Sequence, residues 1–464
     1  MNIKNLISLL TGVLISLSTL GQTPQVADPS LLTAKADSLL QQGISFGEVV
    51  GWTAGIYADG KILWEGGAGY RDREKSLAAS PEMIHRTASI AKPMTAIAVL
   101  QLVEQGKIDL DQPIQTYLPE FPQKPEGTIT VRYLLTHTSG INAYKNRLDM
   151  VSFKEYSSHL HAMEKFQDRK LVGEPGKVYQ YTTYGYVVLG AIIEKVSGQS
   201  YDTYMEEYVW KPAGMNHTSP EKHKTALENK SMLYKNIKGK LKDDLNTNIS
   251  VKVAGGGLQT TVGDLLRFGA AIISHKLVKA ETLEMMLQNP GIRPKAAGNP
   301  YGMGWFLYNT DPENRIIGHS GAQAGTSTQL LIIPDRGVVI ACLSNTRNSN
   351  AGGLTWQLLD FVQREEELKK PLMKSISLSP QAMDRFTGQY DFGKGGVLTI
   401  RRKGNQLYSD LNQFKGLRIY PASERMVFYR NTPAHFEFDL DEEGSIVKTT
   451  YIQNGKEYYP KKIK

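Results

Sequence analysis

The sequence predicts an α+β fold, in which an antiparallel sheet with flanking helices is followed by a small all-β domain. A hairpin signal lies near the start of the chain and strand patterns recur at residues 315–344, with helical periodicity between them. Beyond a composition break at residues 363–379, hydrophobic residues alternate in short runs. Of the 464 residues, 41% are hydrophobic and 22% are charged, a balance that excludes disordered, collagenous and coiled-coil proteins.

Residues 22–370 are expected to form the α+β domain. Helices are expected at residues 29–42, 89–105, 184–197 and 261–273. Strands are expected at residues 52–57, 61–65, 315–317, 328–333 and 338–344. Asp59-Gly60 separates the first two strands and is a strong hairpin signal. The helix at 89–105 is apolar on most faces and should therefore be buried. The hairpin and the late strands should share one sheet.

The C-terminal part of the chain is expected to be a separate domain. A charged run at residues 364–370 ends the last helix of the first domain, and residues 371–379 read as a linker. Residues 380–464 then show short alternating strands separated by turns, which is typical of a small barrel or sandwich. About 85 residues can bury a core of their own, although only a marginal one.

The first 21 residues have the pattern of a secretory signal peptide. Lys4 is followed by a charge-free run at residues 6–20, and small residues then precede Gln22. The run is shorter than the roughly 20 apolar residues that a membrane span needs, and no later stretch is long and apolar enough. We therefore expect no membrane span and an exported protein, periplasmic or secreted.

Net charge and cysteine content exclude several classes of protein. The formal net charge is +8, with 54 Lys and Arg against 46 Asp and Glu, and basic residues are spread along the chain without interleaved aromatics. Nucleic acid is therefore not an expected partner. The single cysteine, Cys342, excludes an intramolecular disulfide and a multi-cysteine zinc site. The pair His159 and His161 is too short a signal for a metal site, so neither a metal nor a cofactor is expected.

Ser89 is the candidate nucleophile among three Ser-x-x-Lys matches, the others beginning at Ser219 and Ser445. Ser219 lies in a polar loop, and Ser445 lies in the β domain, where residues three apart point to opposite faces. Only Ser89 and Lys92 open a buried helix, where this spacing stacks both side chains one turn apart. A desolvated lysine can give up its proton and serve as the base, and N–H groups at the helix start can hold an oxyanion.

Two later segments carry further candidate groups. Tyr181 ends a loop before an apolar helix and could shuttle a proton if cationic neighbours lowered its pKa. His319 and Ser320 precede a strand, in a stretch that nearly matches the Gly-x-Ser-x-Gly nucleophile elbow. That elbow needs a helix after its serine and a histidine later in the chain, but here a strand follows and His435 is the one later histidine. Ser320 is therefore the weaker alternative to Ser89.

Taken together, these segments resemble the serine β-lactamase and penicillin-binding-protein superfamily, on its class C β-lactamase, D-Ala-D-Ala carboxypeptidase and esterase branch. The resemblance covers about residues 47–361. Its motifs are Ser89-Ile90-Ala91-Lys92, Leu134-Leu135-Thr136-His137-Thr138-Ser139-Gly140, Tyr181-Thr182-Thr183, Pro212-Ala213-Gly214-Met215, Ala254-Gly255-Gly256-Gly257 and His319-Ser320-Gly321. The last of these stands where many members have Lys-Thr-Gly. Tyr-x-Thr is closest to the mitochondrial serine β-lactamase-like proteins, which are regarded as peptidases.

The resemblance implies that the sheet packs against a helical insert with the active site between them. It implies acyl transfer through a serine ester, in which Ser89 attacks a carbonyl while Lys92 and Tyr181 exchange the proton. His319 would line the site, hold the Tyr181 network and add positive charge when protonated. The oxyanion- and substrate-binding residues would be Ser89, Ala322, Thr183, Ser320 and Gly321.

One departure from the family pattern affects the substrate. Thr183 stands where the family has an Asn that helps to bind the amide side chain of β-lactams and peptides. This weakens the case for efficient β-lactam hydrolysis and leaves D-Ala-D-Ala peptides, other peptides and esters open, with a peptidase-like substrate favoured. The alternative function is a penicillin-recognising binding or sensor protein with little turnover, although Ser89 and Lys92 are both present. The sequence does not reveal the oligomeric state.

Overall fold

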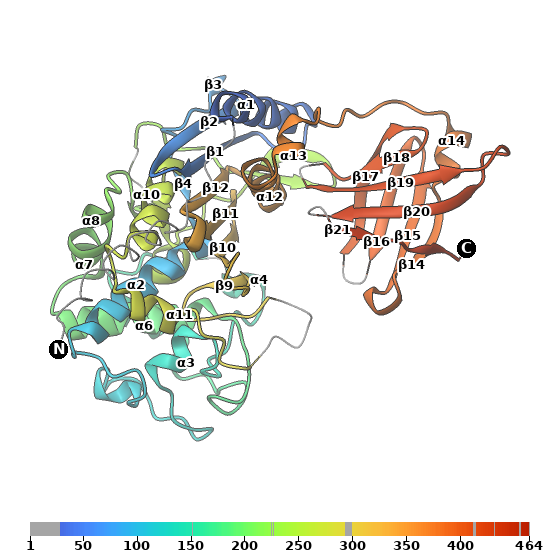
Figure 1. The fold of residues 1–464 in the computed structure, drawn as a ribbon. Coiled ribbons are helices and arrows are strands. Elements are labelled where there is room, and N and C mark those ends of the chain that lie inside the picture. Colours follow the sequence, from blue (N-terminus) through green and yellow to red (C-terminus); the bar gives the residue numbers. More distant parts are fainter. Residues whose placement is uncertain are drawn as a thin grey trace, which may run out of the picture.

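The computed structural model describes residues 28–463, apart from residues 151, 224, 226, 293–298, 412–413, 431 and 454–455. The expected signal peptide at residues 1–21 lies outside the described residues. Within the described residues, no helix is long and apolar enough to cross a membrane. The chain forms an α+β domain and a C-terminal β domain, which lie side by side (Figure 1).

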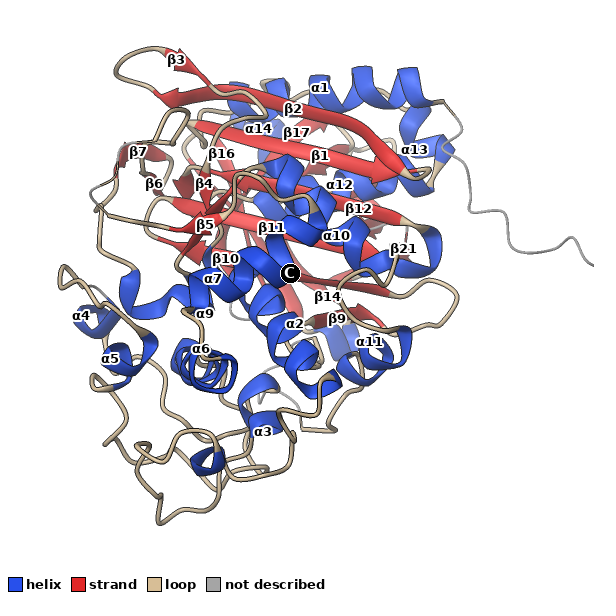
Figure 2. Ribbon diagram, turned by 90° about the vertical axis from the view of Figure 1, so that its left-hand side faces the viewer, coloured by secondary structure: helices blue, strands red, loops and turns tan. Residues whose placement is uncertain are grey.

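A seven-stranded antiparallel sheet forms the centre of the first domain, in the order β3-β2-β1-β12-β11-β10-β9. Its strands are β1 (Gly51–Ala58), β2 (Lys61–Asp72), β3 (Leu77–Ala78), β9 (Phe306–Asn309), β10 (Ile316–Gln323), β11 (Thr326–Ile333) and β12 (Val338–Ser344). The predicted hairpin, β1 and β2, joins the late strands because β1 pairs with β12 (Figure 2). The predicted fold class is confirmed.

The sheet is buried on both faces, because successive side chains of a strand point to opposite sides. In β11, Leu330 and Ile332 join the core that includes the helical part of the domain. Leu331 and Ile333 join a second core beneath α1 (Pro29–Ser45) and α12 (Ala351–Gln363). The sheet is therefore the middle layer, and α10 (Val262–Ile273) packs against β1 and β12 on the side of the first core.

The helical part is built around α2 (Ala91–Glu104), which is buried along most of its length and packs against α6 (Thr183–Ser197) and α9 (Val253–Gly256). The other helices of the domain are α3 (Val131–Leu135), α4 (Arg147–Met150), α5 (His159–Met163), α7 (Tyr201–Met205), α8 (Lys211–Ala213), α11 (Ala280–Met286) and α13 (Glu365–Lys369). The remaining strands of the first domain are short: β4 (His85–Arg86), β5 (Ser219–Pro220), β6 (Tyr234–Ile237), β7 (Lys240–Asp243), β8 (Leu258–Thr260) and β13 (Thr346–Arg347).

The C-terminal domain is a curled nine-stranded antiparallel sheet preceded by α14 (Pro380–Asp384) (Figure 1). Its strands are β14 (Gly388–Asp391), β15 (Val397–Lys403), β16 (Gln406–Leu411), β17 (Phe414–Ser423), β18 (Met426–Phe428), β19 (Ala434–Leu440), β20 (Ile446–Gln453), β21 (Lys456–Tyr458) and β22 (Lys461–Lys462). Phe386, Tyr390, Phe436 and Phe438 belong to a core separate from the two cores of the first domain.

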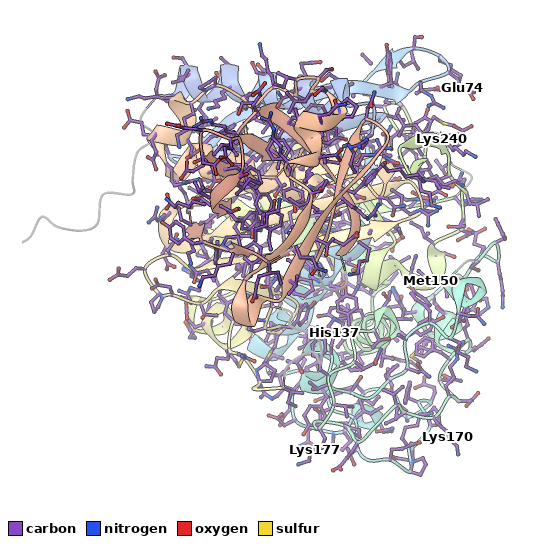
Figure 3. All side chains as sticks on the ribbon, turned by 90° about the vertical axis from the view of Figure 1, so that its right-hand side faces the viewer. Glu74, His137, Met150, Lys170, Lys177 and Lys240 are labelled. Carbon is purple, nitrogen blue, oxygen red and sulfur yellow. The ribbon has the colours of Figure 1, made fainter. Side chains whose placement is uncertain are left out.

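The two domains meet at the end of α1. The Arg430 guanidinium lies between the rings of Phe46 and Tyr420, at 4.0 and 3.4 Å from their centroids, and Arg418 lies 3.5 Å from Glu48. When the C-terminal strands face the viewer, His137 lies below them, in the helical part of the first domain (Figure 3). Among the described residues, no hydrogen bond or ion pair joins residues 380–463 to the predicted catalytic side chains.

We predict that a chain ending at Lys374 keeps the expected esterase activity within about threefold of the full chain, because the removed residues have their own core. Truncation uncovers Phe46, so Phe46→Ser should be added to limit aggregation. The measurement is specific activity of the monodisperse fraction, with circular dichroism as the control for folding. A folded first domain without turnover would show that the C-terminal domain supplies part of the site.

Candidate active site

Ser89 lies in a 3₁₀ turn, η1 (Ala88–Ile90), that runs directly into α2. Ala88 has φ +48°, a left-handed conformation that costs a residue with a side chain about 1–2 kcal/mol. The Thr87 N–H and hydroxyl both donate to the Leu258 carbonyl, at 2.9 and 3.1 Å, and the Thr87 carbonyl accepts from Thr328 at 3.0 Å. Two strands, β8 and β11, therefore hold the strained turn that presents the serine.

Gly321 allows β10 to pass directly against this turn. A Cβ atom at Gly321 would lie 2.7 Å from the Thr87 carbonyl oxygen and 2.9 Å from the Ala88 Cβ. The sequence placed residues 318–325 ahead of a strand, but His319, Gly321 and Ala322 lie within β10 itself. In the described residues, β9 pairs with β10 only as far as Gly318, so the edge beyond it is free of strand partners. Ala322, the second residue predicted to hold the oxyanion, lies on this part of β10 and is exposed.

Lys92 is fully buried beside the serine. Its Nζ lies 3.0 Å from Ser89 Oγ and donates to the Gly255 carbonyl at 2.7 Å, and no described carboxylate pairs with it. Burial and the nearby charge of Lys252 hold the pKa of Lys92 well below its ordinary value. A neutral amine can donate one N–H to Gly255 and direct its lone pair at the serine hydroxyl. The geometry therefore suits a general base.

The short helix α9, which carries Gly255, is anchored from two sides. The Thr95 hydroxyl donates to the Ala254 carbonyl at 2.7 Å, and the Ala254 N–H donates to His159 Nε2 at 3.2 Å. His159 Nδ1 lies 2.8 Å from Glu194, so both ring nitrogens are occupied. The described residues contain no group of three or more His, Cys, Asp or Glu side chains that could hold a metal. His159 thus helps to fix the carbonyl that Lys92 contacts.

Tyr181 completes the group around the nucleophile. Its hydroxyl forms a hydrogen bond with Ser89, and its ring centroid lies 4.9 Å from Lys92 Nζ. Burial raises the pKa of Tyr181 above its ordinary value, because a buried phenolate would be poorly solvated. The condition set for a proton shuttle, that cationic neighbours lower this pKa, is therefore not met. Tyr181 is held as a neutral hydrogen-bond donor, and Lys92 is the better base.

His137 clamps the backbone on both sides of Tyr181, a role that sequence reasoning missed. Its carbonyl accepts from the Gln180 N–H at 2.8 Å, and its Nδ1 accepts from the Thr182 N–H at 3.3 Å. Its ring centroid lies 4.2 Å from that of Tyr181. His137 has φ +59°, and burial with the charge of Lys92 lowers its pKa well below the ordinary value. A neutral ring with an accepting Nδ1 is therefore the form that fits.

His319 is buried and neutral. Burial, with a smaller effect of the Lys92 charge, lowers its pKa to about 3. Nδ1 lies 2.6 Å from the Ser320 carbonyl and donates to it, so Nε2 accepts from the Tyr301 hydroxyl at 3.1 Å. The expected positive charge at His319 is therefore wrong. The ring packs 6.2 Å from Tyr181, but its hydrogen bond goes to Tyr301.

Ser320 lacks the partner that a nucleophile needs: among the described residues, no Lys or His side chain forms a hydrogen bond with its hydroxyl. Ser320 is exposed, its hydroxyl bonds with Tyr308, and a strand rather than a helix follows β10. This arrangement does not suit a nucleophile elbow.

Thr183 lies beside the main site. It is the first residue of α6, and its hydroxyl forms a hydrogen bond with Tyr144. A Cβ at Gly255 would lie 2.5 Å from the Thr183 methyl, so the two residues are in close contact.

Comparison with known proteins places the chain in a family. The Beta-lactamase family model matches residues 36–363. Penicillin-binding protein 4* of Bacillus subtilis (strain 168) is 27% identical over 420 residues, covering 83% of this chain and 89% of that protein. Serine beta-lactamase-like protein LACTB, mitochondrial, of Homo sapiens is 28% identical over 404 residues, covering 64% and 74%. The octameric penicillin-binding protein homologue from Pyrococcus abyssi superposes with a TM-score of 0.67 at 26% identity, covering 92% and 99%.

The chain therefore belongs to the beta-lactamase family, and it is a serine hydrolase. The predicted superfamily is confirmed, and the similarity to the mitochondrial protein agrees with the motif comparison. The catalytic roles of individual residues stay predictions. The distances given above specify which atoms would take part.

We predict that His137 positions Tyr181 through its Nδ1 acceptor. His137→Gly tolerates the positive φ but removes the acceptor, and should lower kcat about 10- to 100-fold with a smaller change in KM. His137→Asn also tolerates this backbone, keeps an oxygen near the Nδ1 position, and should lose less than about fivefold. Steady-state kinetics of both variants, with melting temperature as the control for folding, make the test. Equal losses in the two variants would contradict the clamp.

Proposed function

We propose that the protein is an exported hydrolase that cleaves a peptide-like amide or an ester by forming an acyl-enzyme on Ser89. One observation supports this more than any other: a fully buried lysine lies 3.0 Å from the serine hydroxyl and has no described carboxylate partner. Export rests on the signal-like pattern at residues 1–21. A peptide-like substrate is favoured because Tyr181-Thr182-Thr183 resembles the Tyr-x-Thr motif of the mitochondrial serine β-lactamase-like proteins, which are regarded as peptidases.

Acylation would use Lys92 as the base and Tyr181 as the acid. Lys92 takes the Ser89 proton while Oγ attacks the carbonyl carbon, and the N–H groups of Ser89 and Ala322 hold the oxyanion. Tyr181 then gives its hydroxyl proton to the leaving group and recovers a proton from the Lys92 ammonium. The serine proton thus reaches the leaving group by way of two side chains, and the charge of the pair is restored.

Deacylation would reverse the direction of proton transfer. A water molecule attacks the ester carbonyl and loses its proton toward Tyr181 and Lys92, and Ser89 leaves with a proton returned from the same pair. Tyr181 is suited to both steps because its raised pKa keeps the hydroxyl protonated between them. Positioned proton transfer of this kind contributes about 10²- to 10⁴-fold to the rate of a reaction.

The test compares Ser89→Ala with Ser320→Ala on three probes: a para-nitrophenyl ester, a panel of D-Ala-D-Ala and other peptides, and a fluorescent penicillin. Ser89→Ala should abolish the acyl adduct in intact mass spectra and lower kcat/KM at least about 10³-fold. Ser320→Ala should keep the acyl adduct, and it is the matched control because Ser320 on β10 is the weaker alternative nucleophile.

The opposite pattern would transfer the nucleophile to Ser320. A wild-type protein that forms a stable penicillin adduct but turns over none of the probes would instead be a penicillin-recognising binding or sensor protein. Turnover of peptides with only slow loss of the penicillin adduct is the result expected from the threonine at position 183.

A further inference from the structure

A cleft lies between the two domains, on the face of the sheet opposite Ser89. It is lined by α1, α12, α13 and the linker of the first domain and by β18, β19 and β20 of the C-terminal domain, which meet in Figure 1. Of the lining residues, Phe361 belongs to the core beneath α1 and α12, and Leu372 packs against it. Ile90, next to Ser89, belongs to the core on the other face. The sheet therefore separates the cleft from the predicted active site.

The cleft is large enough for a small molecule and has apolar walls on both sides. Its volume is about 750 Å³, the part open to solvent included, and ligand sites usually have about 300–1,000 Å³. Phe46, Phe361 and Met373 of the first domain and Phe428 and Ile452 of the C-terminal domain all line it. An apolar ligand body would therefore contact both domains at once.

The main charged groups of the cleft are already engaged. Arg364 lies 2.9 Å from the Asp360 carboxylate and 3.5 Å from that of Glu367, and Lys370 donates to Glu367 at 2.6 Å. The Lys35 ammonium donates to three backbone carbonyls at the end of α13. An ionic ligand would compete with these contacts and would itself lose water, so an uncharged ligand fits the cleft better.

Two buried polar atoms of the cleft have no hydrogen-bond partner among the described residues. They are Gln357 Oε1, which is an acceptor, and Arg364 Nε, which is a donor. Arg364 directly follows α12, about two helical turns after Gln357, so the two side chains lie along one wall. Buried polar groups are normally paired, so a molecule that brings one donor and one acceptor would satisfy both atoms.

An amide carries both of these groups in one small, uncharged unit. Its N–H can donate to Gln357 Oε1, and its carbonyl can accept from Arg364 Nε. A carboxylate offers acceptors alone and an ammonium offers donors alone, and each would add a charge to the cleft. The two unpartnered atoms therefore favour an amide over either ion.

We propose that this interdomain cleft is a second ligand site, which binds a small uncharged molecule with an apolar body and one amide group. The proposal goes beyond the proposed function and does not depend on it, because none of the described lining residues is among the predicted site residues. Since both domains line the cleft, a bound ligand would also hold them together.

The test uses two probes of nearly the same shape, 3-phenylpropanamide and 4-phenylbutan-2-one. The ketone has a methyl group where the amide has its NH₂ group, so it keeps the acceptor and loses the donor. Binding is followed by methyl NMR of the full chain carrying Ser89→Ala, in which an amide cannot be consumed through an acyl-enzyme on Ser89. The methyl groups of Met373 and Ile452, which line the cleft, are the reporters, and Met373→Leu and Ile452→Val assign their signals.

Two variants, each added to Ser89→Ala, test the proposed acceptor. Gln357→Met removes the acceptor and keeps a side chain of similar length. Gln363→Met is the matched control, because Gln363 lies on the same helix but donates to Asn314 and does not line the cleft. Melting temperatures of both variants control for folding.

We expect the amide to shift both reporter signals in a saturable way, with a Kd of about 1 mM or tighter, as suits a probe of this size. The ketone should bind at least about threefold more weakly, Gln357→Met should abolish this preference, and Gln363→Met should retain it.

Three results would overturn the proposal: no saturable shift of the reporter signals, equal affinity for amide and ketone, or a preference that survives Gln357→Met. If Gln357→Met fails to fold, the comparison of the two probes on Ser89→Ala decides alone. Because catalysis is not measured, failure of the proposed function would leave these results unchanged.

Discussion

The burial of Lys92, with no counter-ion among the described residues, is the constraint on which the rest of the site depends. An ammonium in this position would be poorly solvated and repelled by Lys252, so the neutral amine is the stable form. A neutral amine needs an acceptor for its N–H and a donor for its lone pair, and the Gly255 carbonyl and the Ser89 hydroxyl provide them at 2.7 and 3.0 Å. The same burial keeps Tyr181 protonated. The same desolvated region thus lowers the pKa of the base, Lys92, and raises the pKa of the acid, Tyr181.

Holding these groups requires the sheet and the helical part to meet at one point. Gly321 lets β10 approach the turn at Ala88, and β8 and β11 bind that turn through Thr87. From the other side, Thr95 and His159 fix α9 and with it the carbonyl that Lys92 needs. The strained backbone before the serine is tolerated because both halves of the domain hold it in place. Among the residues that the structure describes, no hydrogen bond or ion pair joins the C-terminal domain to these groups.

Local features of the site could be predicted from the sequence, whereas long-range ones could not. The three-residue spacing of Ser89 and Lys92 in an apolar helix shows both the pair and its burial. The positive φ of Ala88 and the clamp by His137 depend on contacts with segments far along the chain. The charge of His319 cannot be predicted from the sequence, because burial sets its pKa and a short polar motif does not reveal burial. The strand order likewise could not be predicted, because it depends on the pairing of β1 with β12, which are far apart in the sequence.

The protonation state of Lys92 tests this account most directly. Lysine labelled with ¹³C and ¹⁵N allows an NMR titration in which the Lys92 signal is assigned by its loss in Lys92→Met. The lowered pKa predicts that Lys92 gains its proton at a pH well below the range in which the surface lysines titrate, and that kcat/KM falls in parallel as Lys92 becomes protonated. A Lys92 signal that titrates with the surface lysines, near their ordinary pKa of about 10.4, would contradict the account.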